Sequence, residues 1–529
     1  MSHTPILIVG AGPTGLLMAC ELARHGVPFR IIDKKTERTL GSNAVWIQTR
    51  TIELFNHIGI ADRFLQYGHI CNSINLYANE KALVNISFDQ IDSLYQFVLM
   101  LPQSETEKIL ENRLQELQYH VERGIELIDI QQIANTVEAQ LSDLSGQIEA
   151  ITCDWLIACD GANSSVRELC KLHFPGGDMT EQFMVADAEL NSFLHSNEIH
   201  VFFNKGTLLA AFPLRENKYR LGANLHLDYP RKFFTEKEVK EMVIDRAHGE
   251  FNVESISWIS PFWVHSKMVE NFRKNRIFLV GDAAHIHAPT LGQGMNTGLQ
   301  DSYNLAWKIA LVIHGKCDAA ILDSYHSERY PVVKNIVDQS ERFTKVAIYE
   351  NKFLISLRNL FFKLIYSQPY FSKKITNQLT QLSAQYLQSP IIEYKNKGGL
   401  LSAGMRAPDV LVESSKKLHD YFNRTKHNIL LLSGLSPNDD SLQKLKALQS
   451  AFIKKYSDIF NVLIVSTLAI EVENNIFDRN KSIHTCYHAK QPAIFIIRPD
   501  NYLACCSAEI NESVIENYLK KLSYYKKGR

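Results

Sequence analysis

The chain has 529 residues, of which 45% are hydrophobic, and its 57 basic and 57 acidic side chains balance to zero net charge. This length suffices for two or three domains, and the balanced charge argues against nucleic acid or an anionic membrane as a partner. No uncharged apolar run of about eighteen residues occurs, so the sequence predicts no membrane span, and no signal peptide is expected. The nine cysteines lack metal-ligand or C-x-x-C spacing, which predicts free thiols in a reducing, cytoplasmic compartment.

The first predicted element is a buried strand that leads into a glycine-rich turn and a helix. Residues 6–15 read ILIVGAGPTG, a G-x-G-x-x-G dinucleotide fingerprint. In this motif Gly10 permits the tight turn, Gly12 lets the backbone approach a pyrophosphate, and Gly15 lets the helix pack on the strand. The first N–H groups of the helix then face the anion.

A second strand follows at residues 29–32 and ends at Asp33, about twenty residues after the glycines. A carboxylate at that place can accept hydrogen bonds from a ribose hydroxyl. The combination of strand, glycine turn, helix, strand and acid indicates a dinucleotide, but it does not distinguish NAD(P) from FAD.

Two later segments help to distinguish between NAD(P) and FAD as the bound dinucleotide. Residues 154–167 read DWLIACDGANSSVR, a buried strand ending at Asp160 and leading into a helix that Ser164 or Ser165 can cap. Residues 276–285 read RIFLVGDAAH, another buried strand that ends in Gly-Asp. They are followed at 289–298 by PTLGQGMNTG, which begins a long helix.

With these three motifs, residues 5 to about 335 resemble the flavoprotein aromatic hydroxylases, single-component FAD monooxygenases related to 4-hydroxybenzoate and phenol hydroxylases. The resemblance implies an α/β fold with a Rossmann-like FAD-binding domain and an inserted antiparallel β-sheet substrate domain. The resulting domain assignment is FAD-binding at 1–173 and 264–345, substrate-binding at 174–263, a helical connector at 346–398 and a thioredoxin-like C-terminal domain at 399–529.

The resemblance also implies which residues hold non-covalent FAD. Asp282 would accept hydrogen bonds from the ribityl hydroxyls, and the helix start near Asn296 would offer N–H groups to the electron-rich edge of the isoalloxazine. The matching glutamine of the family contacts the flavin, which assigns that contact to Gln103. The expected cofactor-binding residues are Gly10, Ala11, Gly12, Pro13, Thr14, Gly15, Asp33, Lys34, Gln103, Asp160, Asp282, Pro289, Gly292, Gly294, Met295 and Asn296.

One position departs from the family. Relatives usually carry Arg-Ala where this chain has Asn43-Ala44, and that arginine helps to hold phosphate or the mobile flavin. The departure puts the docking of the nicotinamide in doubt, although Arg38 and Arg50 lie nearby in the sequence.

Short apolar runs between about 174 and 263 alternate with turns, which predicts the inserted antiparallel sheet. The family resemblance makes this sheet the floor under the substrate, with Phe203, Phe212 and Asn224 as candidate lining residues. The alternation is equally compatible with ordinary core packing. His285 and His287 have an i, i+2 spacing but no nearby third ligand, so no metal is expected.

The remaining chain predicts a connector and a further α/β unit. Residues 353–366 have a strongly apolar helical face that resembles a membrane-surface helix, but burial between domains is the prediction. From residue 399, strands at 428–432, 462–465 and 493–497 alternate with helices and resemble the thioredoxin-like domain of the phenol hydroxylase branch. This unit lacks the C-x-x-C needed for thiol exchange, so a structural or oligomer-contact role is expected, with a homodimer as one outcome.

The sequence therefore predicts an FAD-dependent monooxygenase that hydroxylates a phenolic or polycyclic aromatic substrate. In this family NAD(P)H reduces the flavin, and O₂ then forms a C4a-hydroperoxide that delivers the oxygen; no catalytic side chain is identified. One alternative is a flavin-dependent halogenase, although its G-W-x-W-x-I-P signature is not found and Trp258 and Trp263 do not fit it. Another is a flavin-binding protein without a catalytic cycle.

Overall fold

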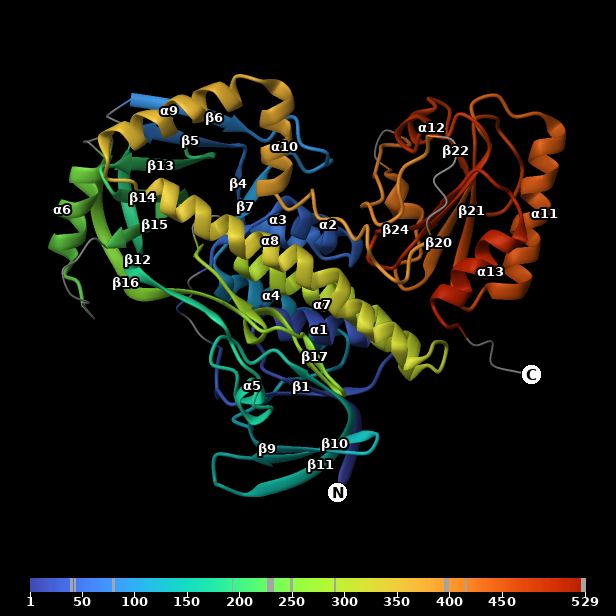
Figure 1. Cartoon of the computed structure of the whole chain (residues 1–529), viewed down its shortest axis with the longest axis horizontal. Coiled ribbons are helices and arrows are strands. Elements are labelled where there is room, and N and C mark those ends of the chain that lie inside the picture. Colours follow the sequence, from blue (N-terminus) through green and yellow to red (C-terminus); the bar gives the residue numbers. More distant parts are fainter. Residues whose placement is uncertain are drawn as a thin grey trace. The chain divides into compact units, whose positions relative to one another are not determined.

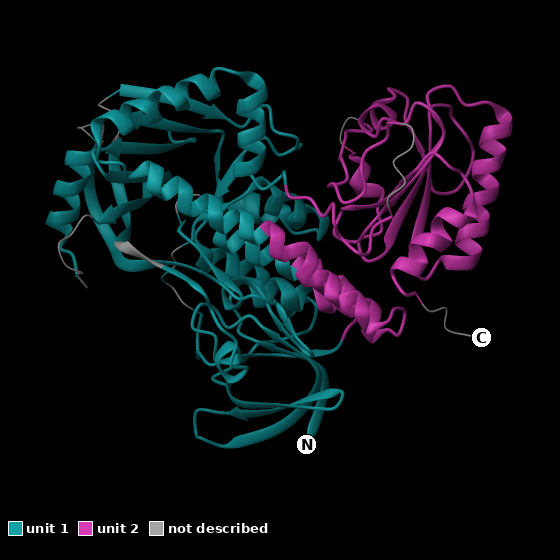
Figure 2. Cartoon of the chain, in the orientation of Figure 1, with its two compact units in different colours: residues 1–20, 28–302, 333–383 teal, residues 21–27, 303–332, 384–529 magenta. Residues whose placement is uncertain are grey.

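The computed structural model describes residues 1–38, 41, 44–78, 81–192, 194–225, 233–247, 251–289, 292–393, 399–413 and 416–524 (Figure 1). The chain divides into two compact units (Figure 2). Unit 1 contains residues 1–20, 28–302 and 333–383, and unit 2 contains residues 21–27, 303–332 and 384–529. Each unit combines sheets with helices, so the predicted α/β class is confirmed.

The first sheet of unit 1 carries the dinucleotide fingerprint. Its strand order is β17-β18-β11-β1-β2-β8, and β10 and β9 extend it from β11. The inner pairs β18–β11, β11–β1 and β1–β2 are parallel, and the side chains of residues 6–9, 155–158 and 277–279 are buried, as the continuous apolar runs predict. The strands are β1 Ser2–Val9, β2 Phe29–Asp33, β8 Glu122–Arg123, β9 Glu126–Ile133, β10 Thr136–Ser142, β11 Ile148–Ala158, β17 Arg273–Lys274 and β18 Ile277–Leu279.

Three of these parallel strands end side by side at one edge of the sheet. β1 leads into Gly10, β11 leads toward Asp160, and β18 leads toward Asp282. In open α/β sheets, ligands bind in the crevice outside the carboxyl ends of the strands. Helices follow each turn: α1 Pro13–Arg24, α5 Ser165–Leu169 and, after a 3-10 turn at Gly281–Ala283, α7 Gly294–Ile313.

The second sheet of unit 1 has the order β19-β16-β12-β15-β14-β13-β5-β6. Its central strands pair antiparallel, whereas β13 pairs with β5 in parallel. The sheet thus extends beyond residues 174–263, because the edge of β13 is paired by a strand from before residue 100. The strands are β5 Ser73–Ala78, β6 Lys81–Ser87, β12 Gly176–Ser192, β13 Glu198–Asn204, β14 Thr207–Pro213, β15 Lys218–Leu225, β16 Phe251–Met268 and β19 His285–Ile286.

A small sheet and several helices complete unit 1. The small sheet has the order β3-β7-β4, with β3 Trp46–Ile47, β4 His69–Cys71 and β7 Val98–Met100. The helices that lie wholly or partly in unit 1 also include α2 Thr49–His57, α3 Ala61–Tyr67, α4 Gln103–Glu116, α6 Glu236–Ala247, α8 Asp323–Ala347, α9 Lys352–Tyr366 and α10 Pro369–Leu379.

Helix α9 corrects one prediction. Its apolar face was expected to be buried between domains, but Phe353 is 74% exposed and Leu364 is 59% exposed. Apolar spacing reports that a helix has two different faces, and it does not report what covers each face. None of the described helices is long and apolar enough to cross a membrane.

Unit 2 is built around a five-stranded sheet of order β22-β21-β20-β23-β24. The three strands β22, β21 and β20 run parallel, and β23 and β24 are antiparallel. The bounds are β20 His427–Leu432, α11 Asp439–Tyr456, β21 Phe460–Ser466, β22 Asn475–Phe477, α12 Ser482–Cys486, β23 Ala493–Ile497, β24 Leu503–Ser507 and α13 Glu512–Lys521.

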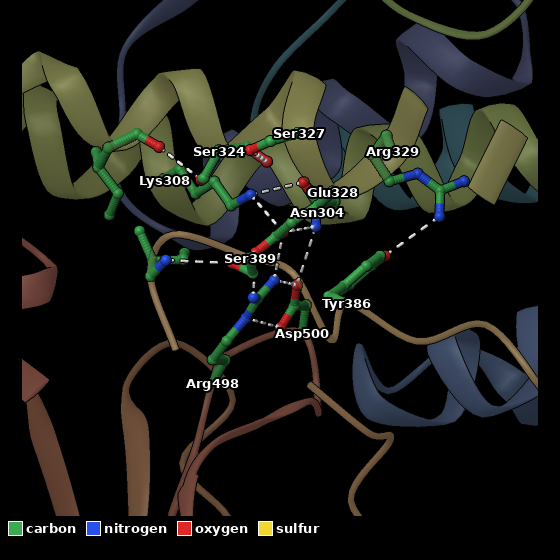
Figure 3. Close-up of polar contacts among 12 residues, drawn as sticks. Asn304, Lys308, Ser324, Ser327, Glu328, Arg329, Tyr386, Ser389, Arg498 and Asp500 are labelled. Carbon is green, nitrogen blue, oxygen red and sulfur yellow. Dashed lines mark hydrogen bonds and ion pairs between the residues drawn. The ribbon is translucent and has the colours of Figure 1, made fainter. Parts of the chain in front are cut away.

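A buried cluster of charged side chains lies inside unit 2 (Figure 3). The Arg498 guanidinium donates to both Glu328 oxygens, at 2.5 and 2.8 Å, and to Asp500 Oδ1 at 2.9 Å. Lys308 Nζ donates to Glu328 Oε2 at 2.7 Å, and these four side chains are at most 2% exposed. Burial opposes the charge on Glu328, but the attraction of Arg498 and Lys308 is greater and lowers its pKa. The charges of two cations and two carboxylates therefore balance each other in a site from which solvent is excluded.

Removing one charge from this cluster should be costly. In an Arg498→Met variant, Asp500 and one side of Glu328 lose their cation, and we expect the free energy of unfolding of unit 2 to fall by about 3–5 kcal/mol. Urea denaturation measures this loss. The control is Lys455→Met in the same unit, which breaks the exposed pairs of Lys455 with Glu512 and Glu516 and should leave the free energy of unfolding nearly unchanged. Equal losses in the two variants would contradict the assigned importance of the cluster.

Candidate active site

A cavity of about 810 Å³ lies in unit 1 at the carboxyl ends of β1, β11 and β18. One part is bordered by the glycine-rich loop and the Gly-Asp turn, and another by strands β12, β14, β15 and β16. The structure brings the following predicted cofactor residues to its wall: Gly10, Ala11, Gly12, Pro13, Thr14, Asp33, Lys34, Gln103, Asp160, Asp282, Pro289, Gly292, Gly294 and Met295. Gly15 and Asn296 lie behind the wall.

The glycines of the first loop differ in what surrounds them. Gly10 has φ +99°, and a Cβ there would lie 2.4 Å from the carbonyl oxygen of Cys159. A Cβ on Gly15 would lie 1.9 Å from the Gly10 oxygen, so Gly15 serves the packing of α1 against the turn. A Cβ on Gly12 would meet nothing within 4 Å. The backbone at Gly12 therefore faces open cavity, which fits a ligand that approaches the main chain.

Asp33 closes this end of the cavity. Its Oδ2 accepts a hydrogen bond from the Ala11 N–H at 2.7 Å, and its Oδ1 accepts from the Lys35 N–H at 2.9 Å. A carboxylate has about four acceptor positions, so Asp33 can hold the glycine loop and still accept from a ribose hydroxyl.

Asp160 is tied to the helix that follows it. Its Oδ2 accepts from the Val166 N–H at 3.0 Å, whereas its Oδ1 is buried and has no hydrogen-bond partner within the described part of the chain. Burial raises the pKa of this carboxyl. The helix cap is Ser164, which accepts from the Arg167 N–H, so of the two predicted capping serines the structure selects the first.

Asp282 lines the cavity, and its side chain is exposed to that space. Among the described residues, no group donates a hydrogen bond to it. Burial raises its pKa, an effect that His285 opposes and Asp301 reinforces. A carboxylate left without a protein donor beside a cavity fits a ligand that brings hydroxyl groups, as the ribityl chain of FAD does.

Two side chains of α7 hold the loops at this end. Asn296 Oδ1 accepts from the Gln48 N–H at 2.9 Å, and its Nδ2 donates to the carbonyls of Trp46, at 2.7 Å, and Gly292, at 2.9 Å. The Asn296 side chain therefore faces the protein, and any contact of this helix start with a flavin would come from its backbone. Asp301, which sequence reasoning missed, accepts from the Gly281 N–H at 3.2 Å and contacts His285 Nε2 at 2.7 Å.

Gln103 and His287 line the cavity between these two ends. Gln103 donates its amide to Glu107 at 2.9 Å, which fixes the side chain at the start of α4. His287 Nδ1 donates to the Ala288 carbonyl at 3.0 Å, and its Nε2 has no partner among the described residues. Burial lowers the pKa of His287 to about 4, so its imidazole is neutral at pH 7 and presents Nε2 as an acceptor.

Of the three candidate substrate residues, only Phe212 lies on the cavity wall. Phe212 lines the cavity, whereas Phe203 packs in the core under the Arg358 guanidinium, 4.7 Å from its ring centre. Asn224 is fully buried and bonds the Leu208 N–H and the Gly206 carbonyl, so it closes a turn of the sheet. Side chains that were not predicted but line this part are Phe183, Arg220, Trp258 and Phe262.

Arg220 and Trp258 form one arrangement on this floor. Arg220 is held by two hydrogen bonds to Asp187, one of them at 2.7 Å, and its guanidinium lies 5.2 Å from the Trp258 ring centre. Their spacing in the sequence gives no signal, because the three residues come from three different strands.

The two arginines considered for nicotinamide docking differ in their access to the cavity. Asn43 lies outside the described residues. Arg38 lines the cavity and pairs with Glu111 at 3.2 Å, whereas Arg50 is buried against Glu53 at 3.0 Å, away from the cavity wall. Arg38 is therefore the better placed of the two cations.

Comparison with known proteins places these motifs in a family. A family model described as an FAD binding domain matches residues 3–340. The chain is 29% identical to pentachlorophenol 4-monooxygenase of Sphingobium chlorophenolicum over 84% of this chain and 82% of that protein. It is 30% identical to a flavin-dependent monooxygenase of Mycobacteroides abscessus, over 82% and 89% of the two chains. The solved anhydrotetracycline hydroxylase of Streptomyces rimosus superposes with a TM-score of 0.77 at 26% identity and covers 98% of this chain and 99% of its own.

We expect substitution of Asp282 to weaken FAD binding and substitution of Asp160 to lower stability. Asp282→Ala should weaken FAD binding by about 1.5–3 kcal/mol, because a charged acceptor for buried hydroxyls is removed while no internal hydrogen bond is lost. Asp160→Ala should mainly lower stability, because the Val166 N–H loses its acceptor. Fluorescence titration of the apoprotein with FAD, combined with thermal unfolding, separates the two effects. An unchanged FAD dissociation constant in Asp282→Ala would remove its assigned role.

Because the pKa of His287 is lowered in the folded protein, we expect the stability of the protein to depend on pH. Its pKa of about 4 in the folded protein lies below the ordinary value of 6.5. Between these values the unfolded chain binds a proton that the folded chain does not, so stability falls as the pH decreases from 6.5 toward 4. A His287→Gln variant should show a shallower decline over this window in denaturation of the apoprotein. His120→Gln, at an exposed position, should keep the wild-type slope, and identical slopes for both variants would contradict the prediction.

Proposed function

Because the chain belongs to the FAD binding domain family and is an FAD-dependent monooxygenase, we propose that it hydroxylates a phenolic or polycyclic aromatic compound with NAD(P)H and O₂. FAD, when bound, accepts electrons from the nicotinamide and activates O₂ for transfer of one oxygen atom to the ring. The observation that carries the proposal is one cavity with a free carboxylate, Asp282, in one part and aromatic side chains in another.

We assign the cofactor contacts by what each group can offer. The N–H groups of the glycine loop and of the first turn of α1 would bind the pyrophosphate. Asp33 would accept from the adenosine ribose, and Asp282 from the ribityl hydroxyls. The backbone between Gly292 and Met295, at the N-terminus of α7, would place positive potential against the flavin edge and favour its reduced, anionic form.

The substrate would lie over the second sheet. Phe183, Phe212, Trp258 and Phe262 provide apolar and aromatic surface that excludes water and positions a planar ring. Exclusion of water from the reacting centre protects reactive intermediates from hydrolysis. Arg220 is neutralised by Asp187, so this floor favours an uncharged or weakly polar aromatic compound over an anionic one.

The relatives support this substrate class. The names of two similar proteins specify pentachlorophenol and anhydrotetracycline, one a small phenol and the other a polycyclic aromatic compound. We propose the same breadth for this chain, with Arg38 as the cation available to the phosphates of NADPH or NADH.

The C-terminal sheet supports a further structural assignment. Its elements follow the order β20-α11-β21, then β23-β24-α13, with β20 between β21 and β23. We propose that this is a thioredoxin-like domain with a structural task. Cys505 and Cys506 are adjacent and buried, and they lack the spacing for disulfide exchange.

Turnover tests the proposal. Phenolic and polycyclic compounds should stimulate NAD(P)H oxidation and yield hydroxylated product in a stoichiometric amount. Phe212→Ala should raise the KM for that substrate about tenfold, because an aromatic contact is lost, while Phe203→Leu, away from the cavity, should leave KM unchanged. Incorporation of chloride would indicate a halogenase, and FAD binding without oxidation or product for any aromatic compound would indicate a flavin-binding protein without a catalytic cycle.

A further inference from the structure

Helix α9 presents a continuous apolar face to solvent. Its side chains recur at helical spacing, so they lie along one side of the helix. Their exposed fractions are large: Phe353 74%, Leu357 53%, Leu360 54%, Phe361 57% and Leu364 59%. Helix α10 follows after two residues and adds Tyr370 at 73% and Phe371 at 52%. Bulky apolar side chains that are exposed together along one face of a helix are typical of a binding surface.

The opposite side of α9 is firmly attached to unit 1. Phe362 and Tyr366 pack against the apolar core that contains Phe203. Arg358 is buried, donates to the Ala347 carbonyl at 2.8 Å, and covers the Phe203 ring. The helix lies along the β5–β6 end of the second sheet (Figure 1). The exposed face is therefore the outer side of a docked helix.

Basic side chains predominate around this face, and the acidic residues beside it are Glu350, directly before the segment, and Asp92. Residues 351–392 contain five basic side chains and no aspartate or glutamate, although the whole chain is neutral. Arg358 is buried, and Lys373 pairs with Asp92 at 2.6 Å. For Lys352, Lys363 and Lys374 the described residues supply no acidic partner, and all three are exposed. The balanced charge of the chain thus conceals a local basic surface around the apolar face.

We propose that α9 and the start of α10 bind the surface of an anionic lipid bilayer. An amphipathic helix with bulky apolar side chains and flanking lysines lies in the interface, with the apolar side chains among the acyl chains and the lysines at the headgroups. At 1.5 Å per residue α9 is about 22 Å long, shorter than a bilayer core, so it lies on the membrane and does not span it.

A second copy of the chain fits this face less well. A two-fold contact would place the same face on both sides. Asp92 is already paired with Lys373, so Lys352, Lys363 and Lys374 of one copy would meet the same lysines of the other without an acidic partner from residues 351–392. Anionic headgroups supply the missing charge.

Vesicle flotation of the FAD-loaded full chain tests this proposal. The protein should float with vesicles of phosphatidylcholine mixed with phosphatidylglycerol, bind phosphatidylcholine alone more weakly, and dissociate as salt is raised. A Lys352→Gln, Lys363→Gln, Lys374→Gln variant should bind the anionic vesicles at least about tenfold more weakly. A Leu360→Gln, Leu364→Gln variant should lose flotation on both vesicle types.

The matched control is Leu144→Gln, which removes an apolar side chain that is 75% exposed elsewhere in unit 1. This variant should float like the wild type, and an unchanged FAD content verifies the fold of every variant. The proposal is overturned if the wild type does not float with anionic vesicles, or if all variants float equally. It is also overturned if light scattering shows a dimer that the Leu360→Gln, Leu364→Gln variant dissociates, which would assign the face to a second copy.

Discussion

The cavity depends on two polar side chains that tie helix α7 to the loops around it. The Asn296 amide satisfies the Gln48 N–H and the carbonyls of Trp46 and Gly292, and Asp301 bonds the Gly281 N–H. Both side chains are fully buried, so loss of either would leave backbone groups without water or protein partners, which is costly. These ties hold the helix N-terminus and the Asp282 turn in a fixed relation.

The part of the cavity that we propose for the cofactor could be predicted from the sequence, because the glycines and aspartates that form it are set by local structure. Gly10 needs a positive φ and Gly15 needs close packing, and each leaves its trace as a glycine at a fixed distance from the strand. Asp33 is the last residue of buried strand β2, and Asp282 lies in the turn that follows buried strand β18. Parallel pairing then brings the strand ends together, so sequence position predicted most of the residues that reach the cavity, with Gly15 and Asn296 as the exceptions.

The part of the cavity that we propose for the substrate could not be predicted from the sequence, because its residues meet only through long-range strand pairing. Phe203 and Phe212 are equally plausible in the sequence, yet the register of β13 and β14 places one in the core and the other on the cavity. Trp258 and Arg220 come from strands separated by a helix and carry no motif. Asn296 was recognised as part of a motif, but its side chain bonds to the protein interior.

The buried ionic cluster determines when unit 2 can fold during synthesis of the chain. Glu328 and Lys308 belong to helices in the middle of the chain, while Arg498 and Asp500 lie near its end. A ribosome that has released residue 328 must add about 170 more before the partner guanidinium exists. Until Arg498 has been synthesised, Glu328 and Lys308 must remain exposed to solvent, because burial without Arg498 would leave the cluster without one of its cations. The core of unit 2 can therefore close only after residue 498 has been synthesised, and a chain that stops before this residue retains charged groups at a place that is interior in the folded unit.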